Sequence, residues 1–424
     1  MDAQEIRSLG PRLEKFLEEF DNAFFRTDTR AHLPTYVEGQ LSGLPRKSVE
    51  PIALRAHVPP RTLQNFLSVL KWDEGLMRDR VAEIVLRDHF HSQAVGIIDE
   101  TSDGKQGAKT PGVQRQYCGS SGKVDNCIVT VHLAYANPDF HCLLDGELFL
   151  PQSWSDDRPR CRQAGIPDET LYRPKWKIAL ELLDRARANG VSFAWLTFDE
   201  GYGGKPDFLR ELSRRGQPFV AEVPKSLTGW ITVPETTERA YRRRGRGSPR
   251  RTPRLKSGET PAQSVEHHLL HSPAFHRQKW VPYRIKDGDK GPLIWQAKHA
   301  EFHLPDENGL PGPAWHLIVA RNPLDGEIKF FLDNAPPGVK VTVRLLVAFS
   351  RWKVERCFED QKGEIGLDHY EGRSWKGLLR HLILSSVSYL FLAKVRRELG
   401  GKKSGAHRLS GSRSRRLPDT LLVA

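Results

Sequence analysis

Cysteine, long apolar runs and a cationic leader are scarce or absent in this 424-residue sequence. Its five cysteines form no C-x2-C pair, which excludes a zinc ribbon, and their odd number argues against a secreted disulfide framework. Residues 1–5 hold no cationic segment before an apolar core, and no stretch approaches the apolar length of a membrane span. We therefore expect a protein of the reducing cytoplasm with no membrane partner.

Positive charge is concentrated in two segments. Lys and Arg outnumber Asp and Glu by 65 to 52. Residues 225–300 hold 16 basic and 6 acidic residues, residues 394–424 hold 9 and 2, and the rest of the chain is slightly acidic. Such concentrated charge favours a polyanionic partner, because binding to nucleic acid releases counterions.

Hydrophobic periodicity divides the first half of the chain into helices and strands. Residues 1–90 read as helical, and two short helices across Pro59-Pro60 predict a helix-turn-helix that binds DNA. The order that follows is βββαβαβ, which is that of an RNase H-like α/β fold, with the first strand beside the fourth. The expected elements are strands 94–99, 127–135 and 141–150, a helix 174–188, a strand 193–199, a helix 205–215 and a strand 219–223.

A basic, β-rich insertion is expected to interrupt this core. Its strand candidates are 231–233, 280–285, 293–298, 315–321 and 329–332. Residues 241–251 are too rich in charge, glycine and proline to fold alone, so we expect an arm that becomes ordered on DNA. The arm residues predicted to bind DNA are Arg242, Arg243, Arg244, Arg246, Arg250 and Arg251.

The last third returns to helix, over 345–363 and 375–398, before a low-complexity tail. Five segments are thus predicted: a helical DNA-binding domain 1–90, a first part of the core 91–224, the basic β-rich insertion 225–340, the C-terminal core helices 341–398, and a basic flexible tail 399–424.

Three carboxylates are candidates for a catalytic site. Asp99 and Asp199 each end an apolar run, and Glu355 follows late in the chain. Two Mg²⁺ ions held by carboxylate oxygens can activate water or a DNA 3′-hydroxyl for in-line displacement at phosphorus. We predict that Asp99 bridges two Mg²⁺ ions, for which Mn²⁺ can substitute, while Asp199 ligates one ion and Glu355 the other.

Other acids rank lower as metal ligands. Glu100 and Glu200 should point away from the site, because successive side chains in a strand alternate between faces. Asp103, Asp333 and Asp368 lie in turn-like sequence. Taken singly, any such carboxylate is more often solvated or a helix cap than a ligand.

Glu355 stands within the pattern R-x3-E-x6-K, between Arg351 and Lys362. On one continuous helix the three side chains would lie within about 40° of one another, so that two phosphate-binding cations flank a metal ligand. The alternative is that both cations are ordinary surface charges that stabilise the helix through i,i+4 pairs.

Four motifs resemble those of the DDE insertion-sequence transposases, specifically the insertion-sequence 701 and 4 groups. They are Gly96–Thr101, Thr197–Gly203, Arg351–Lys362 and Gly366–Glu371. The resemblance implies the roles given above for Asp99, Asp199 and Glu355. Ala348 stands where the family signature Y-x2-R-x3-E-x6-K has tyrosine, so end cleavage is implied more directly than a hairpin intermediate.

The resemblance also implies partners and a location. They are double-stranded DNA, as element ends and as target, a homodimer or larger synaptic complex, and the bacterial cytoplasm with nucleoid association on DNA. Two alternatives stay open: a catalytically inactive DNA-binding relative, decayed or acting as a repressor, and a stand-alone RNase H-like nuclease that cuts without joining strands.

Overall fold

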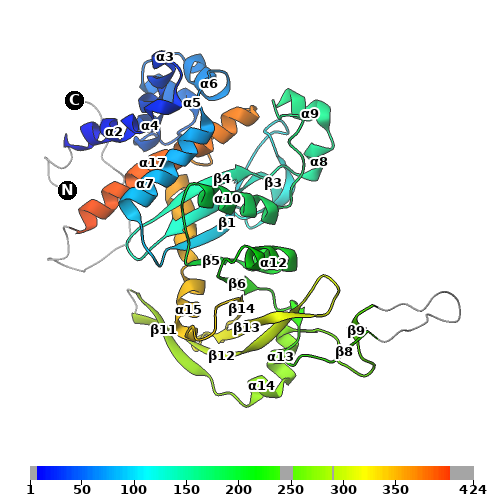
Figure 1. Ribbon diagram of the computed structural model, residues 1–424. Helices are drawn as coiled ribbons and strands as arrows, with labels where there is room; N and C mark the ends of the chain where they lie inside the picture. Colours follow the sequence, from blue (N-terminus) through cyan, green and yellow to red (C-terminus); the bar gives the residue numbers. More distant parts are fainter. Residues whose placement is uncertain (1–6, 239–251, 289–290, 402–424) are drawn as a thin grey trace. The chain divides into compact units, whose positions relative to one another are not determined.

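A computed structural model describes residues 7–238, 252–288 and 291–401 (Figure 1). The chain forms two compact units. Unit 1 combines residues 1–192 with 352–424, and unit 2 is the intervening segment 193–351.

Helices make up the start of unit 1, as the sequence predicts for residues 1–90. α5 and α6 are the two short helices expected on either side of Pro59, and His57 makes the turn between them with a left-handed φ of 55°. Pro60 occupies the first turn of α6, where its missing N–H costs no hydrogen bond. The helices are α2 (Leu9–Glu18), α3 (Thr27–Arg30), α4 (His32–Leu41), α5 (Val49–Arg55), α6 (Pro60–Ser68) and α7 (Glu74–His89).

The sheet of unit 1 contains the expected antiparallel meander. β3 (Lys123–Ala136) pairs with both β1 (Val95–Gly104) and β4 (His141–Leu148), and it also pairs with β2 (Gln114–Cys118), which the sequence did not predict. Residues 127–136 of β3 are all buried, so both faces of this strand are covered. α8 (Gln152–Ser155), α9 (Arg158–Gln163) and the predicted helix α10 (Lys175–Ala188) follow.

The two faces of this sheet are covered by different helices. Asp145 on β4 is paired with Arg78 of α7 and Arg185 of α10, which places these helices on one face. The register partner of Asp145 in β3 is Leu133, so the side chain of the neighbouring His132 lies on the opposite face. There His132 packs edge-on against Phe358 of the helix α16 (Trp352–Asp360). α16 therefore covers the opposite face.

The prediction of one continuous helix over residues 345–363 was wrong. α15 (Val341–Phe349) ends before a turn at Ser350 and Arg351, α16 then begins, and a π-helix (Gln361–Ile365) succeeds it. α15 belongs to unit 2, where Phe349 packs on Trp295 and Phe331. α16 belongs to unit 1, so the turn lies at the boundary between two separate cores.

α17 (Trp375–Gly401) is the helix predicted over 375–398. It packs against β4 and against α4, α6 and α7. Among the described residues, it is the one helix that is both long enough and apolar enough to cross a membrane. Of its most apolar 18-residue window, 89% is buried inside the protein. The expectation that no stretch reaches that apolar length was therefore wrong, and the burial is that of a core helix.

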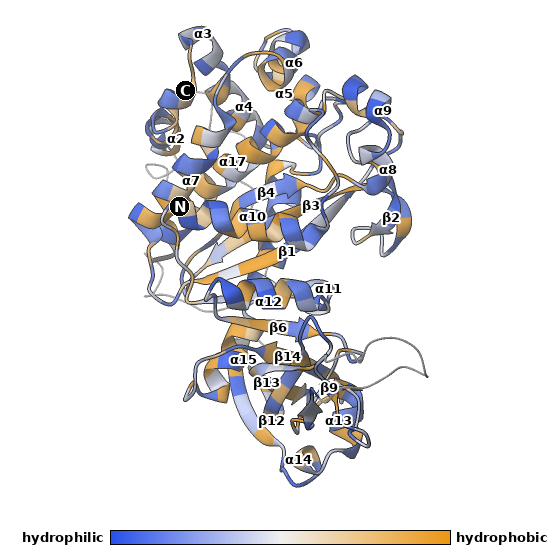
Figure 2. Cartoon of the chain, turned by 45° about the vertical axis from the view of Figure 1, so that its right-hand side comes forward, coloured by the Kyte–Doolittle hydropathy of each residue, from blue (hydrophilic) through white to orange (hydrophobic). Residues whose placement is uncertain are grey.

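Unit 2 is built on a six-stranded mixed sheet with the order β11-β12-β13-β14-β6-β5. β5 and β6 are parallel and are joined by α11 and α12, whereas the other neighbours are antiparallel. Figure 2 shows hydrophilic and hydrophobic residues alternating along α12, which buries Phe208, Leu209 and Leu212. The elements of this sheet and its helices are β5 (Trp195–Phe198), α11 (Glu200–Gly203), α12 (Pro206–Arg214), β6 (Phe219–Val223), β11 (Val281–Gly288), β12 (Gly291–Pro305), β13 (Pro311–Arg321) and β14 (Ile328–Asp333).

The insertion is β-rich, as expected, with two corrections. The strand predicted at 231–233 is absent, since residues 231–233 form a bend and an extended segment beside a single bridge from Trp230 to His303. Two helices were not expected, α13 (Val265–His271) and α14 (Pro273–His276). Four two-residue strands complete it: β7 (Thr228–Gly229), β8 (Thr236–Thr237), β9 (Arg254–Leu255) and β10 (Gln263–Ser264).

Two predicted segments cannot be compared with the structure. The six arginines of the arm (Arg242, Arg243, Arg244, Arg246, Arg250 and Arg251) lie outside the described residues, as does the tail beyond residue 401. The order βββαβαβ is present along the chain, with β2 and three short helices added. The five predicted segment boundaries stay predictions.

Candidate active site

Asp99 lies in the middle of β1, on the face that α16 covers. Its side chain is buried, with Oδ1 accepting a hydrogen bond of 2.8 Å from the backbone N–H of Glu100. Across the sheet its register partner is His132, and directly paired side chains share one face. Since His132 packs on Phe358, the helix that carries Glu355 lies over the face of the sheet that carries Asp99.

Glu355 occupies an exposed position on α16, one turn before the buried Phe358. Residues three apart are neighbours on a helix surface, so Glu355 stands at the solvent-facing edge of the contact between α16 and the sheet. Unit 1 thus holds two of the three predicted carboxylates, Asp99 buried in the sheet and Glu355 at an exposed edge.

The two cations of the predicted helix face lie on different elements. The ammonium group of Lys362, in the π-helix, donates a hydrogen bond of 2.8 Å to the carbonyl oxygen of Ser102, three residues beyond Asp99 on β1. Arg351 lies in the turn before α16 and belongs to unit 2, where its Nε is 4.0 Å from Glu222 of β6. The one continuous helix on which this prediction was built was therefore wrong, and the flanking of Glu355 by both cations stays a prediction.

Asp199 ends β5 in unit 2 and caps the single-turn helix α11. Its Oδ1 accepts hydrogen bonds from the backbone N–H groups of Gly201 at 3.0 Å and Tyr202 at 3.3 Å. Gly203 in this helix is required, because a Cβ there would lie 1.9 Å from the carbonyl oxygen of Glu222. Asp199 and Asp99 belong to different units, so their convergence stays a prediction.

The donor set suits magnesium in its chemistry. All three predicted ligands offer hard carboxylate oxygens, which Mg²⁺ prefers. Within the ranges 7–238, 252–288 and 291–401, the structure gathers no three His, Cys, Asp or Glu side chains that could hold a metal ion.

The acids ranked lower have other partners. Glu100 forms a 2.6 Å ion pair with Lys175, and Asp333, which is fully buried, is paired with Arg344 at 3.4 Å. Asp103 is paired with Lys105 at the end of β1. The pKa of Asp103 is raised from 3.8 to about 6, mainly by burial and also by nearby Asp368, while Lys105 and Lys362 oppose the shift.

Asp103 should give the chain a pH-dependent stability. Because the folded-state pKa is raised, folded chain holds a proton between pH 4 and 6 that the unfolded chain has released, so stability falls as pH rises through that window. Asp103→Asn abolishes this titration. The unfolding free energy of the variant minus that of the parent should rise by roughly 2–3 kcal/mol from pH 4 to pH 7 in urea titrations. A difference that is flat or falls with pH would contradict the assignment.

His132 is a residue near the site that the sequence analysis missed. It is 1% exposed, its Nε2 is 2.7 Å from Thr130 Oγ1, and its Nδ1 is buried without a hydrogen-bond partner within the described chain. Burial, Lys362 and Arg78 lower its pKa to about 3, so the ring is neutral. Gly146 makes room for it, since a Cβ there would lie 2.4 Å from Nδ1. The only sign of His132 in the sequence was a single histidine within a largely apolar predicted strand.

Comparison with known proteins identifies the class. The family described as "DDE superfamily endonuclease" matches residues 19–292, well over half of the chain. The chain therefore belongs to the DDE superfamily endonucleases. The matched segment contains Asp99 and Asp199 and ends before Glu355.

One similar protein is described as a probable transposase. The chain is 34% identical over 190 residues to a protein from Microchaete diplosiphon described as a probable transposase for insertion sequence element IS701. The aligned part is 44% of this chain and 46% of that protein, so the chain spans about half the length of the relative. Among solved structures, the NurA nuclease from Sulfolobus solfataricus aligns with 63% of this chain and 83% of its own, at 11% identity and a TM-score of 0.26.

Proposed function

We propose that this protein is a DNA transposase that binds the ends of an insertion sequence, nicks the 3′ end of the transferred strand and joins that strand to target DNA. The observation that carries this proposal is the placement of α16, which bears Glu355, across the sheet face that bears Asp99. Membership of the DDE superfamily endonucleases and the likeness to a probable transposase support it.

In this proposal Asp99, Asp199 and Glu355 hold two Mg²⁺ ions within an RNase H-like core. When bound, the ions supply an activated nucleophile and stabilise the leaving oxygen of the phosphodiester. Burial of Asp99 and the hydrogen bond from Glu100 N–H fix its carboxylate before substrate arrives, whereas Glu355 at the exposed edge can meet DNA. Lys362, tied to the backbone of β1, keeps a positive charge beside the same strand for the scissile phosphate.

The remaining parts of the proposal concern DNA and assembly. The helix pair α5 and α6 and the arm over 241–251 would hold element ends and target DNA, with Arg351 joining them at the cleavage site. A homodimer or larger synaptic complex would bring two ends together in the bacterial cytoplasm, associated with the nucleoid. The proposed pathway does not include a DNA hairpin at the cut end, because Ala348 stands where the family signature has tyrosine.

A cleavage assay tests this function. Full-length protein is incubated with linear DNA carrying the inverted repeats that flank its reading frame, in Mg²⁺, in Mn²⁺ and with chelator. We expect 3′-end nicks and joined target strands with either metal and neither product with chelator. Salt-dependent DNA binding without metal-stimulated cleavage would instead select the inactive relative, and cleavage without joined strands would select a stand-alone nuclease.

A further inference from the structure

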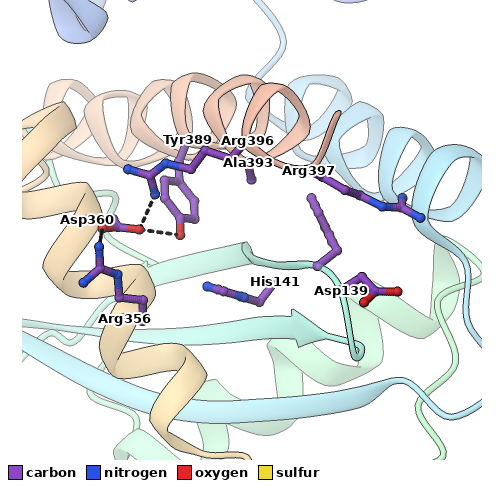
Figure 3. A pocket seen from close by; sticks show the side chains of 9 residues that line it. Asp139, His141, Arg356, Asp360, Tyr389, Ala393, Arg396 and Arg397 are labelled. Atoms are coloured by element: carbon purple, nitrogen blue, oxygen red, sulfur yellow. Dashed lines mark hydrogen bonds and ion pairs between the residues drawn. The ribbon is translucent and has the colours of Figure 1, made fainter. Parts of the chain in front are cut away.

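A cavity of about 600 Å³ lies in unit 1 beside the helix that carries Glu355 (Figure 3). Three elements line it: the turn before β4 and its first residue, α16, and α17. Its volume lies within the range of small-molecule sites. The lining residues are Asp139, Phe140, His141, Arg356, Asp360, Tyr389, Ala393, Arg396 and Arg397.

One buried carboxylate organises the cationic side of this cavity. Asp360 is 3% exposed and receives Arg356 Nη2 at 2.8 Å, Arg396 Nη1, and the Tyr389 hydroxyl at 3.3 Å. Figure 3 shows the two arginines and the tyrosine converging on it from α16 and α17. The side chain of Arg396 remains 40% exposed, so its guanidinium is held by Asp360 on one side and open on the other. Arg356, 37% exposed, is held by Asp360 through Nη2 and by Glu359 through Nη1 at 2.9 Å.

The charge of the lining favours an anion. Three arginines and two aspartates line the cavity, and Asp360 is enclosed while Asp139 is exposed on the rim. Glu359, outside the lining, pairs with Arg356, so Arg396 is the arginine best placed to receive an anion. His141, which reaches into the cavity in Figure 3, is neutral, because burial and then Lys353 lower its pKa to about 4. A fixed guanidinium matches the oxygens of a phosphate in two hydrogen bonds, and a neutral imidazole can add a third.

We propose that this cavity binds a backbone phosphate of the DNA substrate, with Arg356 and Arg396 as its ligands and Asp360 as the residue that positions them. Arg356 directly follows Glu355 on α16, so the two side chains leave one helix about 100° apart. A strand presented to Glu355 thus meets a second anchoring point on the neighbouring flank of that helix. This assignment rests on the proposed function for the identity of its ligand.

The test is the salt dependence of DNA binding without divalent metal, measured by fluorescence anisotropy on labelled element-end duplex. The variant is the pair Arg396→Gln with Asp360→Asn, which leaves the net charge of the protein unchanged. We expect affinity about tenfold weaker and a log–log salt slope lower by about 1, as for one lost phosphate contact. Thermal melting and circular dichroism verify that the variant is folded.

Two further variants separate binding from ion pairing. Arg344→Gln with Asp333→Asn removes an arginine–aspartate pair that is buried in unit 2, outside the cavity, and should bind DNA as the parent does. Arg396→Lys keeps the charge and the partner of Asp360 but loses the planar fork, and should fall between the parent and the double variant. If the double variant fails to fold, the affinity and salt slope of Arg396→Lys test the phosphate site instead.

Parent-like affinity and slope in the Arg396 variants would overturn the phosphate site, as would a parent that binds no duplex DNA. Failure of the proposed function looks different, because the parent would then bind DNA, the slope would fall in the double variant, and Mg²⁺ would produce no cleavage. Conversely, cleavage by the parent with unchanged slopes in all variants would leave the function standing and remove the phosphate site.

Discussion

Asp99→Asn is expected to lower the rate of the proposed Mg²⁺-dependent DNA cleavage by about a thousandfold, since Asp99 as the proposed metal ligand would contribute several kcal/mol of transition-state stabilisation. The substitution keeps the shape of the side chain and an Oδ1 that can accept the hydrogen bond from Glu100 N–H, so the fold should persist. Single-turnover cleavage of labelled element-end DNA measures the loss. Parent-like cleavage by Asp99→Asn would refute the role of this carboxylate.

Glu100→Gln is the matched control for this experiment. The residue is adjacent to Asp99, carries the same charge and is paired with Lys175 at 2.6 Å. Alternation along β1 directs the two side chains to opposite faces, so only Asp99 shares the face covered by α16. Cleavage by Glu100→Gln should stay within about threefold of the parent, because this partly exposed ion pair, on the face opposite Asp99, contributes little. Equal losses in both variants would indicate a general effect of charge on β1.

Arg380→Met is expected to lower the unfolding free energy by about 3–5 kcal/mol, the largest stability effect foreseen for a single side chain here. Arg380 is fully buried on α17 and donates to the carbonyl oxygens of Phe66 and Leu70, at 3.0 and 2.7 Å. It also pairs with Glu74 at 2.6 Å and stacks over the ring of Trp72 at 4.2 Å. Its removal takes the Arg380 donor from the carbonyl oxygen of Leu70, whereas that of Phe66 keeps the hydrogen bond from Trp72 Nε1 at 3.1 Å.

Lys376→Met provides the comparison for Arg380→Met. Its ammonium lies 3.8 Å from the same Glu74, but the side chain is 44% exposed, and such pairs contribute less than about 1 kcal/mol. Equilibrium urea unfolding of the three proteins measures the difference. Similar midpoints for Arg380→Met and Lys376→Met would show that the buried hydrogen bonds contribute little.

Local patterns were sufficient to predict much of the fold. The alternation at β1, β3 and β4 and the proline that precedes α10 are signals carried within a few residues, and each element formed where expected. The helix over 345–363 was wrong because its apolar pattern serves two cores. Phe349 packs within unit 2 and Phe358 within unit 1, and no local signal in Ser350-Arg351 reveals that division.

The three carboxylates stay predicted metal ligands, and the structure bears on where their elements lie within each unit. Asp99 was chosen because it ends an apolar run, although it lies in the middle of β1, and Glu355 because of a spaced motif; their elements meet in unit 1. The partner of Lys362 did not follow, because its contact with Ser102 spans 260 residues of sequence. His132 and Asp360 were missed for the same reason: their meaning depends on burial against distant segments, which periodicity alone does not report.

The packing of α17 has a consequence for the order in which the chain folds. Tyr36 and Gln40 of α4 hydrogen-bond to His381, Ser385 and Ser388, about 345 positions later in the sequence. Loops of that length close slowly, and a ribosome adds only about 5–20 residues per second. The N-terminal helices therefore wait tens of seconds for their buried partners, and unit 1 becomes complete only after α17 has been synthesised.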